Sequence, residues 1–551
     1  MLRFFHLMLL LFYLTGYAQE QKQVDIRQSG SFEVDEARFP GAKILKKNDQ
    51  IRVHLHHDGM DIWSDEAYLY EADNFFEALG NVVVRQGDSL QMTSAYLEYS
   101  GSKRFGVSKS DVVLENNTTT LYTDTLYLDR TQQEAYYTTK GTIIDEETTI
   151  NSLSGTYFIE SKKYEFQSDV KIQNPNFEMF SDRLDFYTEN KHAYFYGPTT
   201  IIGPDYEVFC RRGYYDTENK IGYFQKEAAI DYNARHITGD SIYFDDKRQY
   251  ASANQNVQII DTVDNNIIRG HFGEVFQARD SAIVTLEAVA INVIDGDSLY
   301  IHADTLVATG TPDDRILRGY YGVRIFKSDL SGKSDSIYVR QKLGRTKLLR
   351  LPLSVRDQQL LTPSEITQRN PVLWFGKSQM TGDVVHLIND TVNNVLDSLV
   401  IYNNAFIVEQ DSLNPNNHNQ IKGIDLFGKF TDNELKTVDI VKNAEMIYYL
   451  YDDEDLELVG IDKTVCSSMR LFIEDNGIKT ITFYTQPEGT VYPENDLPEN
   501  ARRLSAFLWR GNEVIESIDQ LIINKMQLPA PKPKVVEKPL KKKNLKLISN
   551  E

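Results

Sequence analysis

Three histidines and an aspartate near the start of the chain, His54, His56, His57 and Asp58, are of the types that bind metal ions. Imidazole nitrogens and a carboxylate this close together could hold zinc or copper. The histidines alternate with apolar residues, however, so His54 and His56 lie on the opposite face of a strand from the apolar set. Solvated histidines on a strand explain this pattern better, and we predict no metal site.

Aspartates recur along the chain in a way that could suggest glycoside hydrolysis, which uses a pair of carboxylates. A catalytic pair must be single and differently tuned from its neighbours, whereas these residues recur many times along the repeats. Turn and strand-cap chemistry explains them more simply. Nucleophile elbow, phosphate-loop, HExxH and CxxC motifs are absent from the sequence. We therefore predict no catalytic residues, no cofactor and no enzyme activity. The aspartates are Asp65, Asp124, Asp182, Asp240 and Asp304.

The segments that carry these aspartates form a repeat. Short phrases with apolar residues at alternate positions begin at intervals of 28 to 34 residues, from SDEAYLY at Ser64 through TDTLYLD at Thr123 and GDSIYFD at Gly239 to SDSIYVR at Ser334. Midway between them lies a second phrase with two apolar or small residues two apart. Each period thus holds two strands joined by polar turns. About ten such periods of about 30 residues predict an all-β stacked architecture.

Each strand is expected to have one dry and one wet face. Asp182, Leu184 and Phe186 should share the dry face of one strand and Tyr187 should point outward, and Asp240 begins another strand of this design. The apolar faces either pack together as a closed core or leave a groove where acyl chains bind at about 0.8 kcal/mol per buried methylene. Alternation alone leaves both possibilities open. The residues predicted to line this interior are Leu69, Val82, Val84, Val112, Leu114, Leu126, Leu128, Ile144, Val170, Ile172, Leu184, Phe186, Ile202, Ile230, Ile242, Phe244, Val257 and Ile259.

The two ends and the middle of the chain differ from the repeat. The first residues combine Arg3, an apolar run and a small-residue end at Ala18, which predicts a cleaved signal peptide and export. A Pro-rich stretch after the repeats is expected to be a connector with about one helical turn, and a Lys- and Pro-rich end a disordered tail. The predicted division is 1–18 signal peptide, 19–44 lead-in, 45–345 repeat domain, 346–372 connector, 373–525 second β-domain, and 526–551 basic tail.

The charge and cysteine content exclude some classes of protein. Asp and Glu outnumber Lys and Arg by 80 to 59, giving a formal charge of −21, so a nucleic-acid partner is disfavoured. Two cysteines, Cys210 and Cys466, exclude a disulfide-rich scaffold, and the spacing does not decide whether they are bridged.

Two segments resemble a known family. The phrase EALGNVVVRQGDSLQMTSAYLEYSG from Glu77 and its continuation TLYTDTLYLDRTQQEAYYTTKGTII from Thr120 are similar to the OstA-like, or LptA-like, repeat of lipopolysaccharide-transport proteins. The resemblance covers residues 45–340 well and the later region loosely. It implies an extended, twisted antiparallel β-jellyroll, followed by a second β-domain of related type, whose interior shields the acyl chains of lipid A.

The resemblance also implies a location and partners. A periplasmic bridge toward the outer membrane would bind lipopolysaccharide, and would pair its edge strands with other jellyroll domains or end to end with itself. The alternative is a secreted β-solenoid or adhesin-like surface protein that binds glycan or protein on its outer face. Outward tyrosines such as Tyr127, Tyr187 and Tyr243 could stack on sugars.

Overall fold

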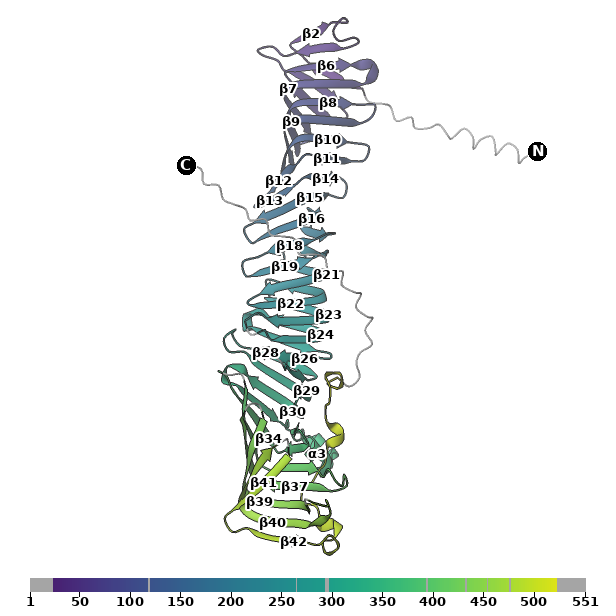
Figure 1. Ribbon diagram of the computed structural model, residues 1–551. Coiled ribbons are helices and arrows are strands. Elements are labelled where there is room, and N and C mark those ends of the chain that lie inside the picture. The colour runs from purple at the N-terminus through teal and green to yellow at the C-terminus, as the bar shows by residue number, and fades with distance from the viewer. Residues whose placement is uncertain are drawn as a thin grey trace, which may run out of the picture.

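The structure is a computed structural model, and it shows one long stack of antiparallel strands (Figure 1). The described residues form 42 strands, which follow one another along the stack from β2 near one end to β42 at the other. The predicted signal peptide and basic tail lie outside the described residues. The structure describes residues 23–116, 119–263, 265–292, 297–392, 395–431, 434–452, 454–474 and 477–522.

The first 31 strands form the repeat region. Their bounds are β1 (Asp25–Gln28), β2 (Ser31–Val34), β3 (Lys43–Lys46), β4 (Val53–His57), β5 (Met60–Ser64), β6 (Glu66–Tyr70), β7 (Phe75–Gln86), β8 (Leu90–Ser100), β9 (Phe105–Asn116), β10 (Thr119–Asp129), β11 (Glu134–Tyr137), β12 (Gly141–Asp145), β13 (Thr148–Ser152), β14 (Ser154–Phe158), β15 (Lys163–Asn174), β16 (Phe177–Tyr187), β17 (His192–Phe195), β18 (Thr199–Ile202), β19 (Tyr206–Cys210), β20 (Arg212–Asp216), β21 (Ile221–Tyr232), β22 (Arg235–Asp245), β23 (Tyr250–Asp261), β24 (Ile267–Phe276), β25 (Ser281–Thr285), β26 (Val289–Asn292), β27 (Leu299–His302), β28 (Thr305–Thr309), β29 (Ile316–Lys327), β30 (Leu330–Arg340) and β31 (Arg345–Leu349).

The stack has two walls that meet along one side. Strand β7 shows the arrangement, because its first half pairs with β6 and its second half with β5. The ladder shifts register between Leu79 and Val82, where Gly80 and Asn81 adopt positive φ angles of 71° and 46°. Such a bulge bends a strand sharply, so the long strands cross from the first wall, which contains β6, to the second wall, which contains β5. The interior lies between the walls.

The recurring aspartates form hydrogen bonds across these corners. Asp65 accepts a hydrogen bond from the Asn81 side chain at 2.8 Å, and Asp240 accepts one from Asn256 at 3.0 Å. The carboxylates thus point to the corner, and the expectation that Asp182 and Asp240 share the buried face is wrong, because both are exposed. At each corner two residues of the neighbouring strand oppose the aspartate, 168 and 169 for Asp182 and 226 and 227 for Asp240, so the regular alternation is broken there.

The connector does not interrupt the sheet. Strand β31 pairs with β34, and β30 pairs with β32, so the walls continue into the last third of the chain. Two short helices, α2 (Val355–Leu360) and α3 (Pro363–Gln368), lie in the chain between β31 and β32. The sequence predicted about one helical turn there. Thr362 and Glu365 form a capping box that starts α3, with Pro363 in its first turn.

The later strands repeat the two-wall design. Their bounds are β32 (Val372–Phe375), β33 (Ser378–Thr381), β34 (Val384–Asp390), β35 (Val395–Tyr402), β36 (Ala405–Gln410), β37 (His418–Gly423), β38 (Asp425–Thr431), β39 (Glu434–Tyr451), β40 (Leu458–Glu474), β41 (Gly477–Tyr484) and β42 (Glu488–Tyr492). One buried apolar cluster runs from Val24 to Leu471 through both regions. The division of the chain into two domains stays a prediction.

A C-terminal strap, residues 493–522, turns back along the outer face of the second wall (Figure 1). Its Leu497 and Leu504 pack on Val408 and Ile447, which point away from the interior. Side-chain amides of the wall bind the strap's main chain. The Gln420 amide donates to the Arg502 carbonyl and accepts from the Leu504 N–H, both at 2.9 Å; Gln379 does the same with Leu508 and Arg510, both at 2.7 Å.

Candidate functional site

The interior between the walls is the candidate site, and most of the predicted lining residues point into it. Their side chains are almost fully buried because successive residues of a strand face opposite sides of the wall. The buried members are Leu69, Val82, Val84, Val112, Leu126, Val170, Ile172, Leu184, Phe186, Ile230, Ile242, Phe244, Val257 and Ile259.

Two predicted lining residues face the solvent instead. Ile144 is 40% exposed and Ile202 is 41% exposed, whereas their neighbours Ile143 and Ile201 are each 1% exposed and point inward. The assignment of Ile144 and Ile202 to the interior was therefore wrong. Each belongs to a pair of adjacent isoleucines, so the apolar pattern is satisfied whichever of the two points inward. The bend of the chain at the corner between the walls determines which isoleucine is buried.

The interior widens near Leu114 and Leu128, which are only half-buried. A cavity of about 410 Å³ opens there between β5, β7, β8, β9, β10, β11, β14 and β15. Its walls are mostly apolar, including Met60, Leu90 and Tyr157, and turn residues of both walls form its mouth. The apolar inner walls suit hydrocarbon, while residues at the mouth such as Arg104, Asp129 and Glu134 offer polar contacts.

Charged side chains stand at the N-terminal end of this mouth. Asp58 forms ion pairs with Arg104 at 3.5 Å and with Arg130 at 3.3 Å. Behind them lie His57, whose pKa is lowered by burial, and Tyr99, whose pKa is raised by burial. The Tyr99 ring is 5.3 Å from the imidazole, so an aromatic layer closes the cavity at this end.

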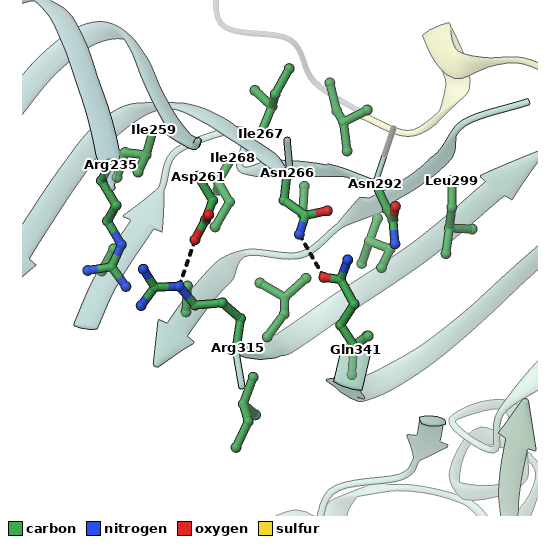
Figure 2. Close-up of a pocket in the computed structure, with 18 residues that line it drawn as sticks. Arg235, Ile259, Asp261, Asn266, Ile267, Ile268, Asn292, Leu299, Arg315 and Gln341 are labelled. Atoms are coloured by element: carbon green, nitrogen blue, oxygen red, sulfur yellow. Dashed lines mark hydrogen bonds and ion pairs between the residues drawn. The ribbon is translucent and has the colours of Figure 1, made fainter. Parts of the chain in front are cut away.

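A smaller cavity of about 80 Å³ lies further along, between β23, β24, β26, β27 and β29 (Figure 2). Its mouth is crossed by polar contacts. Arg315 donates to Asp261 at 2.6 Å and forms an ion pair with Asp280 at 2.8 Å, and Asn266 donates to Gln341 at 2.7 Å. These contacts cross the open side of the stack beside the smaller cavity.

The charged residues at the mouth were missed by reading the sequence for apolar periodicity. Asp58 was considered only as a metal ligand, and Arg130, Lys191 and Arg315 were not singled out. The sequence did contain a signal for these contacts: residues of opposite charge stand in turns that are about one and a half repeats apart.

The histidines considered for metal binding have other roles. His54 and His56 contact the same carboxylate, that of Asp61, at 2.8 and 3.0 Å on the outer side of β4. Within the described ranges, no group of three or more His, Cys, Asp or Glu side chains is placed to hold a metal ion.

The two cysteines are separate buried thiols, which answers the question that the spacing left open. Burial raises the pKa of Cys210 to about 12. Among the helices that the structure describes, none is long and apolar enough to cross a membrane.

Comparisons with known proteins locate the likeness in the N-terminal part of the chain. A family model described as OstA-like protein matches residues 21–182. No curated protein matches the chain. A solved structure of LptH from Pseudomonas aeruginosa, described as the LptA homologous periplasmic component of the conserved lipopolysaccharide transport device, matches 19% of this chain and 79% of its own, at 14% identity and a TM-score of 0.18. The larger cavity lies within the region that the OstA-like family model matches.

Proposed function

We propose that this protein is a periplasmic component of lipopolysaccharide transport that carries lipid in its interior and catalyses no reaction. The observation that carries the proposal is the apolar cavity of about 410 Å³ inside the OstA-like region, with its mouth open to solvent between the two walls. An amphiphile fits such a site because its chains enter the apolar interior while its polar head stays in water. The predicted signal peptide supports export to the periplasm.

The walls on either side of the cavity explain how acyl chains would be held. Leu114 and Leu128 have apolar surface that no neighbouring side chain covers, and it faces the opening. Each methylene that covers such surface contributes about 0.8 kcal/mol, so a few acyl chains bind firmly without a specific polar contact. The apolar interior continues along the stack on both sides of the cavity.

Photo-crosslinking tests this proposal. A benzophenone amino acid at Leu128, which lines the cavity, should form adducts with lipopolysaccharide in cells, whereas one at the adjacent Tyr127 should not. Tyr127 is a matched control because it follows Leu126 on the same strand but stacks on Tyr136 on the outer face, with ring centroids 4.9 Å apart. Equal labelling at both positions, or none at Leu128 in folded and exported protein, would contradict lipid carriage.

The partners follow from the ends of the stack. Within the described residues, β2 at one end pairs with β3 alone, and β42 at the other end pairs with β40 alone. Open edges of this kind can be extended by a strand from another chain. We therefore include pairing with other jellyroll domains, or with a second copy, in the proposed function.

A second candidate function is glycan binding on the outer face of the first wall. Tyr194, Tyr214, Tyr223 and Tyr243 are successive cross-strand neighbours there, and the first two rings are stacked at 5.6 Å. Sugars bind to rows of aromatic rings of this kind. Replacing Tyr214 by Ala should abolish retention on a glycan array without changing lipid adducts at Leu128, if this function exists.

A further inference from the structure

Polar contacts cross the open side of the stack from one wall to the other. On this open side, the turns between strands of the first wall form one edge, which we call the first lip. The turns between strands of the second wall form the facing edge, the second lip. The polar contacts join the two lips. Four of the contacts join residues that are 44 to 46 positions apart in the chain. These are Asp58 with Arg104, Asp145 with Lys191, Asn176 with Lys220, and Arg235 with Asp280.

The constant separation shows that the contacts belong to the design of the stack. Each repeat has about 30 residues, so two residues about 45 positions apart are separated by one and a half repeats. Residues at this separation lie in turns on opposite lips that face each other. Figure 2 shows two further contacts across the lips, from Asp261 to Arg315 and from Asn266 to Gln341, which are 54 and 75 positions apart and do not follow this separation. In the described part of the chain, each of these contacts is made by a side chain, whereas the corner side is held by continuous main chain.

Several of these contacts are shielded from water. The side chain of Arg235 is 3% exposed, that of Arg315 is 8% exposed, and those of Asp145 and Asp261 are 8% and 10% exposed. Salt screens such pairs much less than it screens surface pairs. They therefore keep the lips closed under ordinary ionic conditions, yet they can separate without breaking a covalent bond or a strand ladder.

The larger cavity lies in the interval between two of the contacts. Going along the stack, the Asp58 contact precedes it and the contact of Asp145 with Lys191 follows it. In that interval, described turn residues of the two lips, such as Ser89 and Gln133, line the mouth of the cavity. Beyond Lys191 further contacts follow, and the interior cavity beside Arg315 has about 80 Å³, compared with about 410 Å³ for the larger cavity.

We propose that these contacts form a releasable clasp, which makes the larger cavity the side entrance for lipid and controls movement of lipid beyond Lys191. This inference rests on the proposed function. A lipid whose chains are inside and whose sugar head is outside can move along the stack only through the slit between the lips. A closed contact across the slit stops the head, so each contact must open for the lipid to pass.

A reversible crosslink between the lips tests the clasp. Asp145→Cys and Lys191→Cys are combined and joined by a short bis-methanethiosulfonate reagent, which dithiothreitol cleaves. A benzophenone amino acid is placed at Leu128 in the larger cavity or at Leu317 in the smaller one, and the full mature chain is incubated with purified lipopolysaccharide. The locked protein should keep its adducts at Leu128 and lose those at Leu317 by at least tenfold, and dithiothreitol should restore them.

The controls separate failure of the clasp from failure of lipid carriage. Each single cysteine variant, treated with the same reagent, should label both positions as the unlocked double variant does, because it cannot form the crosslink. Adducts at Leu317 that persist in the locked protein would overturn the clasp, and so would their absence from the unlocked protein, because the contacts would then be a fixed seal. Absence of adducts at Leu128 would instead overturn lipid carriage itself.

Discussion

Ile143 and Ile144 have the same side chain, but one is buried in the interior and the other lies on the surface. We predict that Ile143→Asp destabilises the protein by more than about 4 kcal/mol, because it places an unpaired carboxylate in the apolar interior. Ile144→Asp should cost less than about 1 kcal/mol, because this position is 40% exposed. Chemical denaturation of both variants checks the difference. Equal loss of stability would show that the strand faces are assigned wrongly.

Alternation along the strands was enough to predict most of the inward residues, because one face of each strand must be dry. It was not enough at Ile144 and Ile202, because each has an adjacent isoleucine and the pattern does not show which of the two points inward. It also misplaced Asp182 and Asp240, because the register shift at each corner depends on a pair of residues with positive φ, and polar pairs such as Ser110-Asp111 look like ordinary surface residues in the sequence.

Buried histidines make stability depend on pH. Burial lowers the pKa of His57 and of His302 below the ordinary value of 6.5, so both are neutral in the folded protein while the unfolded chain takes up protons. Their contribution to stability is present above pH 6.5 and is lost as the pH falls below it. We predict a lower free energy of unfolding at pH 5.5 than at pH 7.5, measured by urea denaturation.

The matched variant assigns that pH dependence to the histidines. His57→Gln should reduce the difference between the two pH values, and adding His302→Gln should reduce it further, since neither glutamine titrates. His236 is the control, because it is solvent-exposed in an ion pair with Asp231 at 2.7 Å. A pH difference that stays the same in the double variant would refute the assignment.

At the scale of elements, the C-terminal strap is the part that the sequence did not reveal. Apart from short turns it has no regular structure, so it has no period to detect, and its contacts are made by Gln379 and Gln420, which are more than 80 residues away in the chain. Alternation predicts the strands that the strap covers, but it does not explain why their outward residues, such as Val408, are apolar. The strap packs on these residues and buries them.

The strap should open as a unit when its anchor is removed. Leu504→Ala should lower the free energy of local opening by about 2 kcal/mol or more, because it deletes buried contacts with the second wall. Hydrogen exchange of strap amides such as that of Arg510 measures this opening. Ile518→Ala is the control, since Ile518 is 47% exposed, and faster exchange in that variant alone would contradict the anchoring role of Leu504.

At the scale of the whole molecule, the stack behaves as a one-dimensional array. Each repeat pairs with the repeats beside it, so stability depends on neighbouring interfaces and the ends are the weakest places. Side-chain contacts close one long side, and main chain closes the other. This arrangement lets the interior open along the lips while the walls remain intact, which a closed sandwich core could not do.

The ends of the stack should also determine its self-association. Strand β2 presents an open edge of the first wall, with Phe32 and Val34 54% and 56% exposed, and β41, which ends the same wall at the far end, carries Tyr484, which is 43% exposed. Head-to-tail pairing of these edges would cover apolar surface and satisfy main-chain groups, so we predict concentration-dependent linear oligomers in sedimentation experiments. Phe32→Lys with Val34→Lys should abolish them, because charged residues on an edge strand oppose pairing. Ile518→Lys, equally exposed but on the side of the stack, should leave them unchanged; oligomers that survive the edge variant would place the contact elsewhere.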